Sequence, residues 1–188
     1  ILFISLSLFY YYFKKESNMK KIFIAGMLLV SALIAKAQNE NTEKIKVGDI
    51  MPTFTLVADN GNEVLKSSSL AGKVVLVNFF ATWCPPCQKE LAAVESKLWP
   101  EFKDNANFKL LVIGRDHTNE ELKTYNTKKN FTFPLYADKG RVVFDSFASS
   151  TIPRSYLIDK NGKVIHISIG FNETEFSELM QKIEEAIK

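Results

Sequence analysis

The sequence is poor in side chains that bind metal ions or build a disulfide framework, with two cysteines and two histidines in 188 residues. Cys84 and Cys87 lie three residues apart. A tetrahedral zinc site needs four ligands, but His117 and His166 are far apart in the sequence and each lies in or beside a strand-like run. A structural disulfide is disfavoured too, because so small a loop removes little entropy from the unfolded chain. We therefore expect no metal site and interpret Cys84 and Cys87 as a redox-active pair.

Long apolar runs are also missing, since none reaches the ~20 residues that cross a membrane. The clearest run, 22–35, follows Met19-Lys20-Lys21 and precedes Ala35-Lys36-Ala37. This pattern predicts a signal peptide over residues 19–37, cleaved after Ala37, with 1–18 as an upstream or mis-annotated leader. No cysteine follows the run, which argues against a lipoprotein anchor, and an uncleaved membrane anchor is the alternative. We therefore expect an exported, periplasmic protein.

An excess of basic charge is absent once this leader is set aside. Residues 1–37 hold five Lys and one Glu, so the remainder carries 19 basic and 20 acidic residues, a formal charge of −1. Nothing in that balance predicts nucleic acid or an anionic membrane surface as a partner. Repeats and low-complexity tracts are absent too. The remainder is predicted as a flexible lead-in, residues 38–46, and one domain, 47–188.

What the sequence does contain is a redox motif at a strand-to-helix junction. The apolar run from Val74 to Phe80 predicts a strand buried on both faces, and Cys-Pro-Pro-Cys then opens a helix. Cys84 falls at the helix N-cap, where unpaired amides and the helix dipole stabilise a thiolate. Prolines at the first two helical positions break no hydrogen bond.

The same placement predicts different roles for the two thiols. The amide of the second helical position belongs to a proline, so we expect the amide of Cys87 to donate to the Cys84 sulfur. Cys84, the outer thiol of lower pKa, would attack a substrate disulfide, and the more buried Cys87 would resolve the mixed disulfide.

Further elements are predicted from turns, caps and periodicity. Asp59-Asn60-Gly61-Asn62 predicts a hairpin turn, and Pro100 is expected to kink or end the helix that follows the cysteines. Other predicted strands cover residues 53–57, 63–65, 108–114, 133–136, 155–159 and 164–169. Predicted helices cover residues 118–129, 140–148 and 172–187. Thr118 with Glu121, and Asn172 with Glu175, are expected to cap the first and last of these helices.

The stretch Val-Asn-Phe-Phe-Ala-Thr-Trp-Cys-Pro-Pro-Cys-Gln-Lys-Glu-Leu resembles the active site of the thioredoxin superfamily, in particular its TlpA/ResA-like extracytoplasmic members. The resemblance runs from about Val47 to Lys188. It implies an α/β, thioredoxin-like fold: a central mixed sheet flanked by helices, with an N-terminal β-hairpin extension and a central β-α insertion.

The resemblance also implies site residues beyond the cysteines. Glu90 matches the glutamate of the family's Cys-x-x-Cys-x-x-Glu and would tune the thiol pKa values and shuttle a proton, an ordinary solvated glutamate being the alternative. Pro153 matches the cis-proline that faces the cysteines, although residues alone would favour a trans bond. Trp83, Ile152 and Gly170 would border the substrate groove, with free backbone groups of Ile152 pairing with substrate and Gly170 letting the chain pass close to the site.

Two positions depart from common patterns. Asn78 stands where thioredoxin has a buried Asp, so it cannot accept the proton of the resolving thiol, and we interpret it mainly as a core amide with its hydrogen bonds satisfied. Arg154 replaces a small polar residue, and is expected either to be exposed to solvent or to bias the site's rim toward acidic partners.

The predicted activity is that of a thiol-disulfide oxidoreductase without a cofactor, acting as a reductase. The resemblance implies protein disulfide substrates, a membrane thiol-disulfide electron transporter as reductant, and cytochrome c maturation as the best-known setting. An oxidase or isomerase could use the same cysteines.

Two other classes of function remain open. A thiol peroxidase needs a Thr three residues before its reactive cysteine and a Pro four further back, where this chain has Ala81 and Val77. A redox-gated binding module would keep the fold without turnover.

Overall fold

A computed structural model of the chain describes residues 42–58 and 64–188. The predicted leader, residues 1–37, and the predicted turn at Asp59–Asn62 lie outside the described residues. Within the described ranges, no helix is both long enough and apolar enough to cross a membrane.

The described chain alternates strands and helices. The strands are β1 (Thr55–Ala58), β2 (Val64–Lys66), β3 (Val74–Phe80), β4 (Phe108–Arg115), β5 (Leu135–Asp138), β6 (Arg154–Ile158) and β7 (Val164–Ile169). The helices are η1 (Ser67–Leu70), α2 (Pro85–Ala93), η2 (Val94–Leu98), α3 (Trp99–Phe102), α4 (Asn119–Lys129), η3 (Lys139–Arg141), α5 (Phe144–Phe147) and α6 (Glu173–Ile187).

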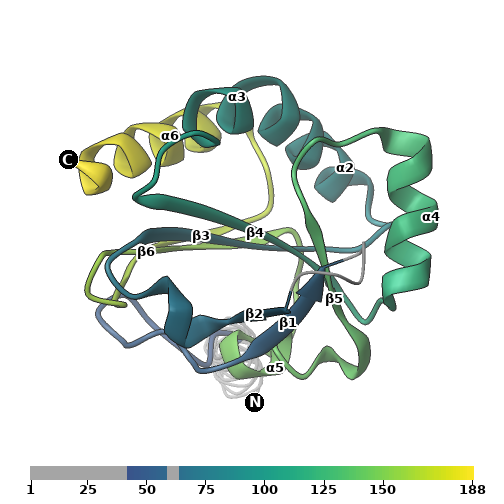
Figure 1. Ribbon diagram of the computed structural model, residues 1–188, viewed down its shortest axis with the longest axis horizontal. Coiled ribbons are helices and arrows are strands. Elements are labelled where there is room, and N and C mark those ends of the chain that lie inside the picture. The colour runs from purple at the N-terminus through teal and green to yellow at the C-terminus, as the bar shows by residue number, and fades with distance from the viewer. Residues whose placement is uncertain (1–41, 59–63) are drawn as a thin grey trace, which may run out of the picture. The chain divides into compact units, whose positions relative to one another are not determined.

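All strands join one mixed sheet in the order β2-β1-β5-β4-β3-β6-β7. β3 pairs parallel with β4 and antiparallel with β6, while the β1–β2 hairpin joins through β5. Figure 1 shows α2, α3 and α6 along one face of the sheet and α5 on the other. The predicted α/β class, with its N-terminal hairpin and the inserted α4 and β5, is confirmed.

β3 is buried along its whole length because both faces of the sheet are covered. Leu76 and Phe80 belong to the apolar cluster under α2 and α6, whereas Val77 and Phe79 face the cluster that contains α5. Phe79 packs edge-on against Phe144, with ring centroids 5.2 Å apart. The predicted buried strand is thus confirmed, and the cysteines follow its C-terminal end.

The helix after the cysteines continues through Pro100. α2 widens into the π-helical η2, and α3 follows η2 without a break, so Pro100 lies inside a continuous helix. A proline there supplies no N–H for a helical bond and crowds the turn before it, which in this chain is the wider π-helical one. Proline therefore changes the type of helix here without stopping it. The predicted inward face is confirmed, since its four positions are buried: Leu91, Val94, Leu98 and Phe102.

The predicted helix over Gly140–Ala148 is wrong in its first half. Gly140 and Arg141 have φ of 76° and 63°, which no α-helix accepts. The Asp138 carboxylate accepts a hydrogen bond from the amide of Phe144 at 2.8 Å. That bond satisfies an amide in the first turn of α5, which therefore begins at Phe144.

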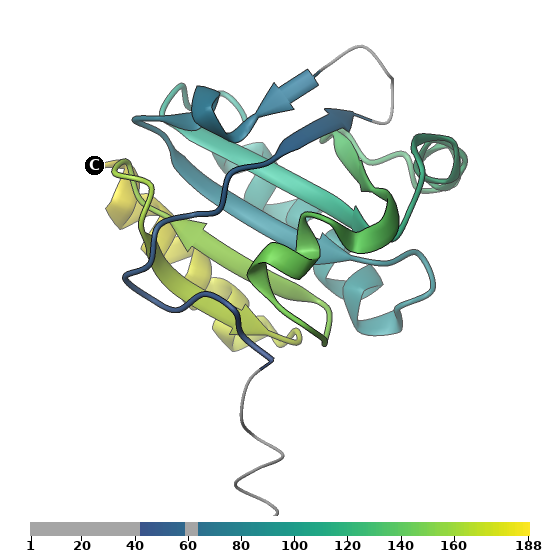
Figure 2. The same ribbon diagram turned by 90° about the horizontal axis from the view of Figure 1, so that it is seen from below.

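The described unit that contains the sheet includes residues 42–46, ahead of the predicted boundary at Val47. Glu43 forms a bridge with Ala148, and Ile45 is buried in the cluster that contains α5. Figure 2 shows the dark blue segment before β1 crossing the sheet on the side of α5. The expected flexible lead-in is therefore wrong for residues 42–46.

Candidate active site

Cys84 and Cys87 form a disulfide at the start of α2, with Cα atoms 5.3 Å apart. Cys84 is the N-cap residue, in an extended backbone conformation, and prolines occupy the first two helical positions. The amide of Cys87 donates to the Cys84 sulfur at 3.3 Å, which confirms the predicted cap. The sulfur thus lies at the N-terminal end of α2 and accepts one helix-end amide, an arrangement that stabilises a thiolate in the reduced form.

The two cysteines differ in access to solvent. Cys84 is 4% exposed and Cys87 is fully buried, whereas the neighbouring Trp83 is 65% exposed. The guanidinium carbon of Arg115 lies 5.7 Å from the centroid of the Trp83 ring, at a distance typical of a cation–π contact. Cys84 is thus the outer sulfur, although only a narrow part of it meets solvent.

The loop before β6 faces this sulfur. The Ile152–Pro153 peptide bond is cis, as the resemblance implied. The Ile152 carbonyl oxygen lies 4.0 Å from the Cys84 sulfur, and the Gly170 amide donates to the Pro153 carbonyl at 2.9 Å. A side chain at Gly170 would meet no atom within 4 Å, so its φ of +83° favours glycine here, not the close approach that we expected.

Glu90 is buried, being 3% exposed, so the alternative of a solvated glutamate is wrong. Ser155 donates its hydroxyl to Glu90 Oε1 at 3.2 Å, and the Asn78 amide donates to the Ser155 hydroxyl at 2.9 Å. Burial raises the pKa of Glu90 to about 7, although the nearby polar side chains of Asn78 and Ser155 oppose the shift.

The interpretation of Asn78 as a fully satisfied core amide is only half right. The residue is 1% exposed and its Nδ2 is hydrogen-bonded, but Oδ1 has no hydrogen-bond partner, as is also true of Glu90 Oε2. Two buried acceptor oxygens therefore lie unpaired on the two residues that meet through Ser155.

The expectation of an exposed or rim-lining Arg154 is wrong. Its side chain is fully buried, forms an ion pair with Glu43 and donates to the hydroxyl of Thr42 at 3.2 Å. Its Nε also donates to the carbonyl of Thr151 at 3.1 Å. Tyr156 donates its hydroxyl to the same Glu43 carboxylate at 2.7 Å. Arg154 therefore connects the N-terminal segment to the cis-proline loop.

Sequence reasoning missed the contact between His117 and the turn before Cys84, because we considered His117 only as a zinc ligand. Its Nε2 accepts a hydrogen bond from the Thr82 amide at 3.1 Å. One signal was present: Thr82 follows β3 and His117 follows β4, and residues after two adjacent parallel strands meet at one edge of the sheet. Within the described ranges, no three His, Cys, Asp or Glu side chains are grouped to hold a metal ion.

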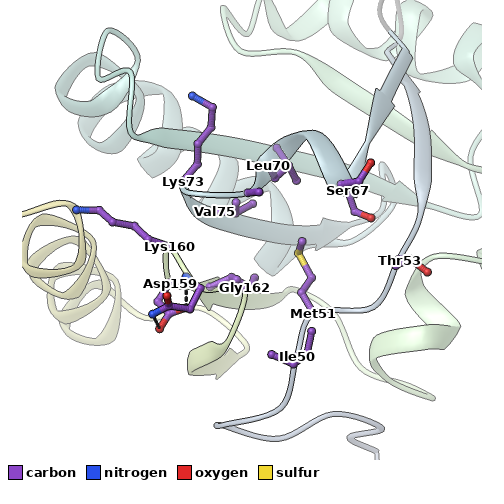
Figure 3. A pocket seen from close by; sticks show the side chains of 14 residues that line it. Ile50, Met51, Thr53, Ser67, Leu70, Lys73, Val75, Asp159, Lys160 and Gly162 are labelled. Atoms are coloured by element: carbon purple, nitrogen blue, oxygen red, sulfur yellow. Dashed lines mark hydrogen bonds between the residues drawn. The ribbon is translucent and has the colours of Figure 1, made fainter.

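A pocket of about 230 Å³ lies away from the cysteines, and Figure 3 shows it. Val75, near the start of β3, lines it, whereas Cys84 follows the end of that strand. The ammonium groups of Lys73 and Lys160 bind backbone carbonyls of Ala106 and Ile187. No residue predicted for the site lines this pocket.

Comparison with known proteins establishes the class. The chain belongs to the AhpC/TSA family, whose sequence profile matches residues 47–167. The chain has a thioredoxin-like fold. A solution structure of a candidate protein disulfide isomerase from Bacteroides thetaiotaomicron is 36% identical in sequence and superimposes with a TM-score of 0.74. The match covers 78% of this chain and 93% of that protein. A candidate thiol:disulfide interchange protein DsbE from Chlorobium tepidum is 26% identical with a TM-score of 0.66, covering 77% and 100%.

Relatives found by sequence show more narrowly which class of protein this is. Thiol-disulfide oxidoreductase ResA of Bacillus cereus (strain ZK / E33L) is 33% identical over 142 residues, which are 75% of this chain and 80% of the relative. ResA of Bacillus subtilis (strain 168) is 30% identical over 159 residues, 80% of this chain and 86% of the relative. The protein is accordingly a thiol-disulfide oxidoreductase similar to ResA.

Proposed function

We propose that the protein is an exported disulfide reductase, in which Cys84 attacks a disulfide of a substrate protein and Cys87 resolves the mixed disulfide. The observation that carries the proposal is the position of the Cys84 sulfur. It caps α2, accepts the Cys87 amide and lies 4.0 Å from the Ile152 carbonyl at the surface of the site.

In the first step, the Cys84 thiolate attacks one sulfur of the substrate disulfide. A bond forms between Cys84 and that sulfur, the substrate S–S bond breaks, and the other substrate sulfur leaves as a thiolate that takes a proton from water. Exposed Trp83 and the backbone of Ile152 flank the attacking sulfur, so an extended substrate segment can pair beside it.

In the second step, the Cys87 thiolate attacks the Cys84 sulfur and forms the Cys84–Cys87 disulfide. The bond between Cys84 and the substrate breaks, and that substrate sulfur leaves as a thiolate. Cys87 must first lose its proton, and Glu90 is the proposed acceptor. The two residues are three apart on α2 and so share a face of the helix. With a pKa of about 7, Glu90 can take up and release a proton near neutral pH.

Trapping of mixed disulfides tests these roles. We expect Cys87→Ser to accumulate covalent complexes with substrate proteins that dithiothreitol dissolves, because the resolving thiol is missing. Cys84→Ser, the matched control, should trap none, since it lacks the attacking thiol. Equal trapping by the two variants on non-reducing gels would contradict the assignment of the nucleophile.

The reductive direction is supported by the charges near the pair. A strong oxidant owes its potency to a reduced form that is stabilised by extra positive groups. No His or Lys lies between the cysteines, and Asn78 and Glu90 add no positive charge. We expect a potential closer to the roughly −270 mV of thioredoxin than to the about −120 mV of DsbA, and one above about −150 mV would favour an oxidase or isomerase.

The cellular setting is proposed from the predicted signal peptide and from the relatives. We place the mature protein in the periplasm, re-reduced by a membrane thiol-disulfide electron transporter, with cytochrome c maturation as the candidate pathway. Fractionation of cells that express the full chain tests this location, and recovery of uncleaved protein in the cytoplasm would overturn it. Peroxidase activity is not supported, because buried Ala81 and Val77 occupy the positions where that chemistry needs Thr and Pro.

A further inference from the structure

The turn that leads to Cys84 is held by two side chains, one at the backbone N–H of Thr82 and one at its backbone carbonyl. His117 Nε2 accepts from the Thr82 amide at 3.1 Å, and Gln88 Nε2 donates to the Thr82 carbonyl at 2.5 Å. Thr82 lies beyond the end of β3, and neither bond belongs to a strand ladder or a helix. The Cys84 amide in turn donates to the Ala81 carbonyl at 3.1 Å. Side chains therefore fix the backbone two residues before the reactive sulfur.

His117 is itself firmly placed. It is 7% exposed, and its ring lies 6.4 Å from that of Phe80, centroid to centroid. A Cβ added to Gly114 would lie 3.2 Å from the ring and closer still to Leu122, so the strand behind the imidazole leaves it little room.

The hydrogen bond with Thr82 determines where the imidazole carries its proton. An acceptor nitrogen needs a free lone pair, so Nε2 is unprotonated and the proton of the neutral ring is on Nδ1. Nδ1 faces Glu121 Oε2 at 3.7 Å. That carboxylate is held in place by α4, because it accepts from the amide of Thr118 at 2.7 Å as part of a capping box.

We propose that His117 is a positioning residue for disulfide exchange: its neutral imidazole fixes the turn that aims Cys84, and protonation of the imidazole releases that turn. The inference rests on the proposed nucleophilic role of Cys84. Protonated Nε2 becomes a donor that faces the donor amide of Thr82, so the bond is lost and the turn spends only part of its time in the reactive geometry.

The charged groups around His117 determine when this happens. Burial lowers its pKa below the usual 6.5, and Arg115 acts in the same direction, while Glu121 and Asp116 oppose the shift. The imidazole is therefore neutral at neutral pH and becomes protonated only in acid, below about pH 6.5. The expected effect is slower exchange in acid beyond what protonation of Cys84 itself causes.

The test compares His117→Gln, which keeps an acceptor that does not titrate, with His117→Ala, which has none. For each reduced protein, the rate of attack on a small aromatic disulfide is measured from pH 4.5 to 8 and divided by the thiolate fraction from ultraviolet absorbance. His166→Gln is the matched control, because His166 on β7 is the only other histidine. Glu90→Gln identifies any inflection that belongs to Glu90.

We expect the rate per thiolate of the wild type to fall in acid, with an inflection below pH 6.5 that His166→Gln and Glu90→Gln retain. His117→Gln should match the wild type at pH 7.5 and lack that inflection, and His117→Ala should be about tenfold slower at pH 7.5. An inflection that survives in His117→Gln overturns the inference, whether or not the alanine variant folds. A reduced wild type that does not attack the disulfide at all would refute the proposed function instead.

Discussion

Among single side chains, Glu90 has an environment that its place in the sequence does not reveal. Its position three residues after Cys87 is apparent, but its burial depends on Ser155, 65 residues away, and on Asn78 in β3. Moving a carboxylate out of water disfavours its charged form, which is why its pKa rises to about 7. A glutamate that would be ionised on a solvated helix is thus partly protonated near neutral pH, as its proposed role in proton transfer requires.

This burial predicts how stability depends on pH. The ordinary pKa of 4.5 holds in the unfolded chain, and the folded value is higher, so the folded state binds more protons and loses stability as pH rises from about 4.5 to 7. The full loss, about 3 kcal/mol, is present above pH 7. Glu90→Gln should therefore unfold in more urea than the wild type at pH 8, with little difference at pH 4.5.

The exposed Glu101 of α3 provides the control, since Glu101→Gln removes a carboxylate that is not buried. Its unfolding midpoint relative to the wild type should be the same at both pH values. Equal midpoints for Glu90→Gln and wild type at pH 8 would show that the Glu90 carboxylate ionises in the fold without cost.

At the scale of elements, local signals predicted local structure well. The caps at Thr118 and Asn172 are confirmed, because each joins a side chain to an amide three residues along the chain. The helix proposed from Gly140 failed because its start depends on the Asp138 carboxylate and on a left-handed backbone at Gly140. Helical periodicity reports which face is apolar, but not where the first turn closes.

Across the whole molecule, the buried Arg154 connects parts of the fold that are distant in sequence. Glu43 lies 111 residues before it, yet the two form an ion pair beside the cis-proline loop. A guanidinium taken out of water needs that partner, because an unpaired buried charge is strongly destabilising. The segment from Thr42 to Lys46 is therefore part of the folded unit.

The prediction concerns where the chain can be shortened. A protein that begins at Val47 should lose about 3 kcal/mol of unfolding free energy relative to one that begins at Thr42, because it lacks the Glu43 carboxylate that pairs with Arg154 and the buried side chain of Ile45. Urea unfolding at neutral pH measures the difference, and the full chain without residues 1–41 serves as the reference. Identical midpoints for the two proteins would mean that residues 42–46, with their ion pair, contribute nothing to stability.

The sequence by itself determined the redox pair, the buried strand before it, the helix that Cys84 caps and the general class of fold. Those features depend on spacing and burial patterns within a few residues, which the order of amino acids displays directly. The environment of Glu90, the pairing of Arg154 with Glu43 and the contact of His117 with Thr82 were decided only by the tertiary structure. Each joins residues at least 35 positions apart, and which side chains meet at that range depends on how the sheet and helices pack.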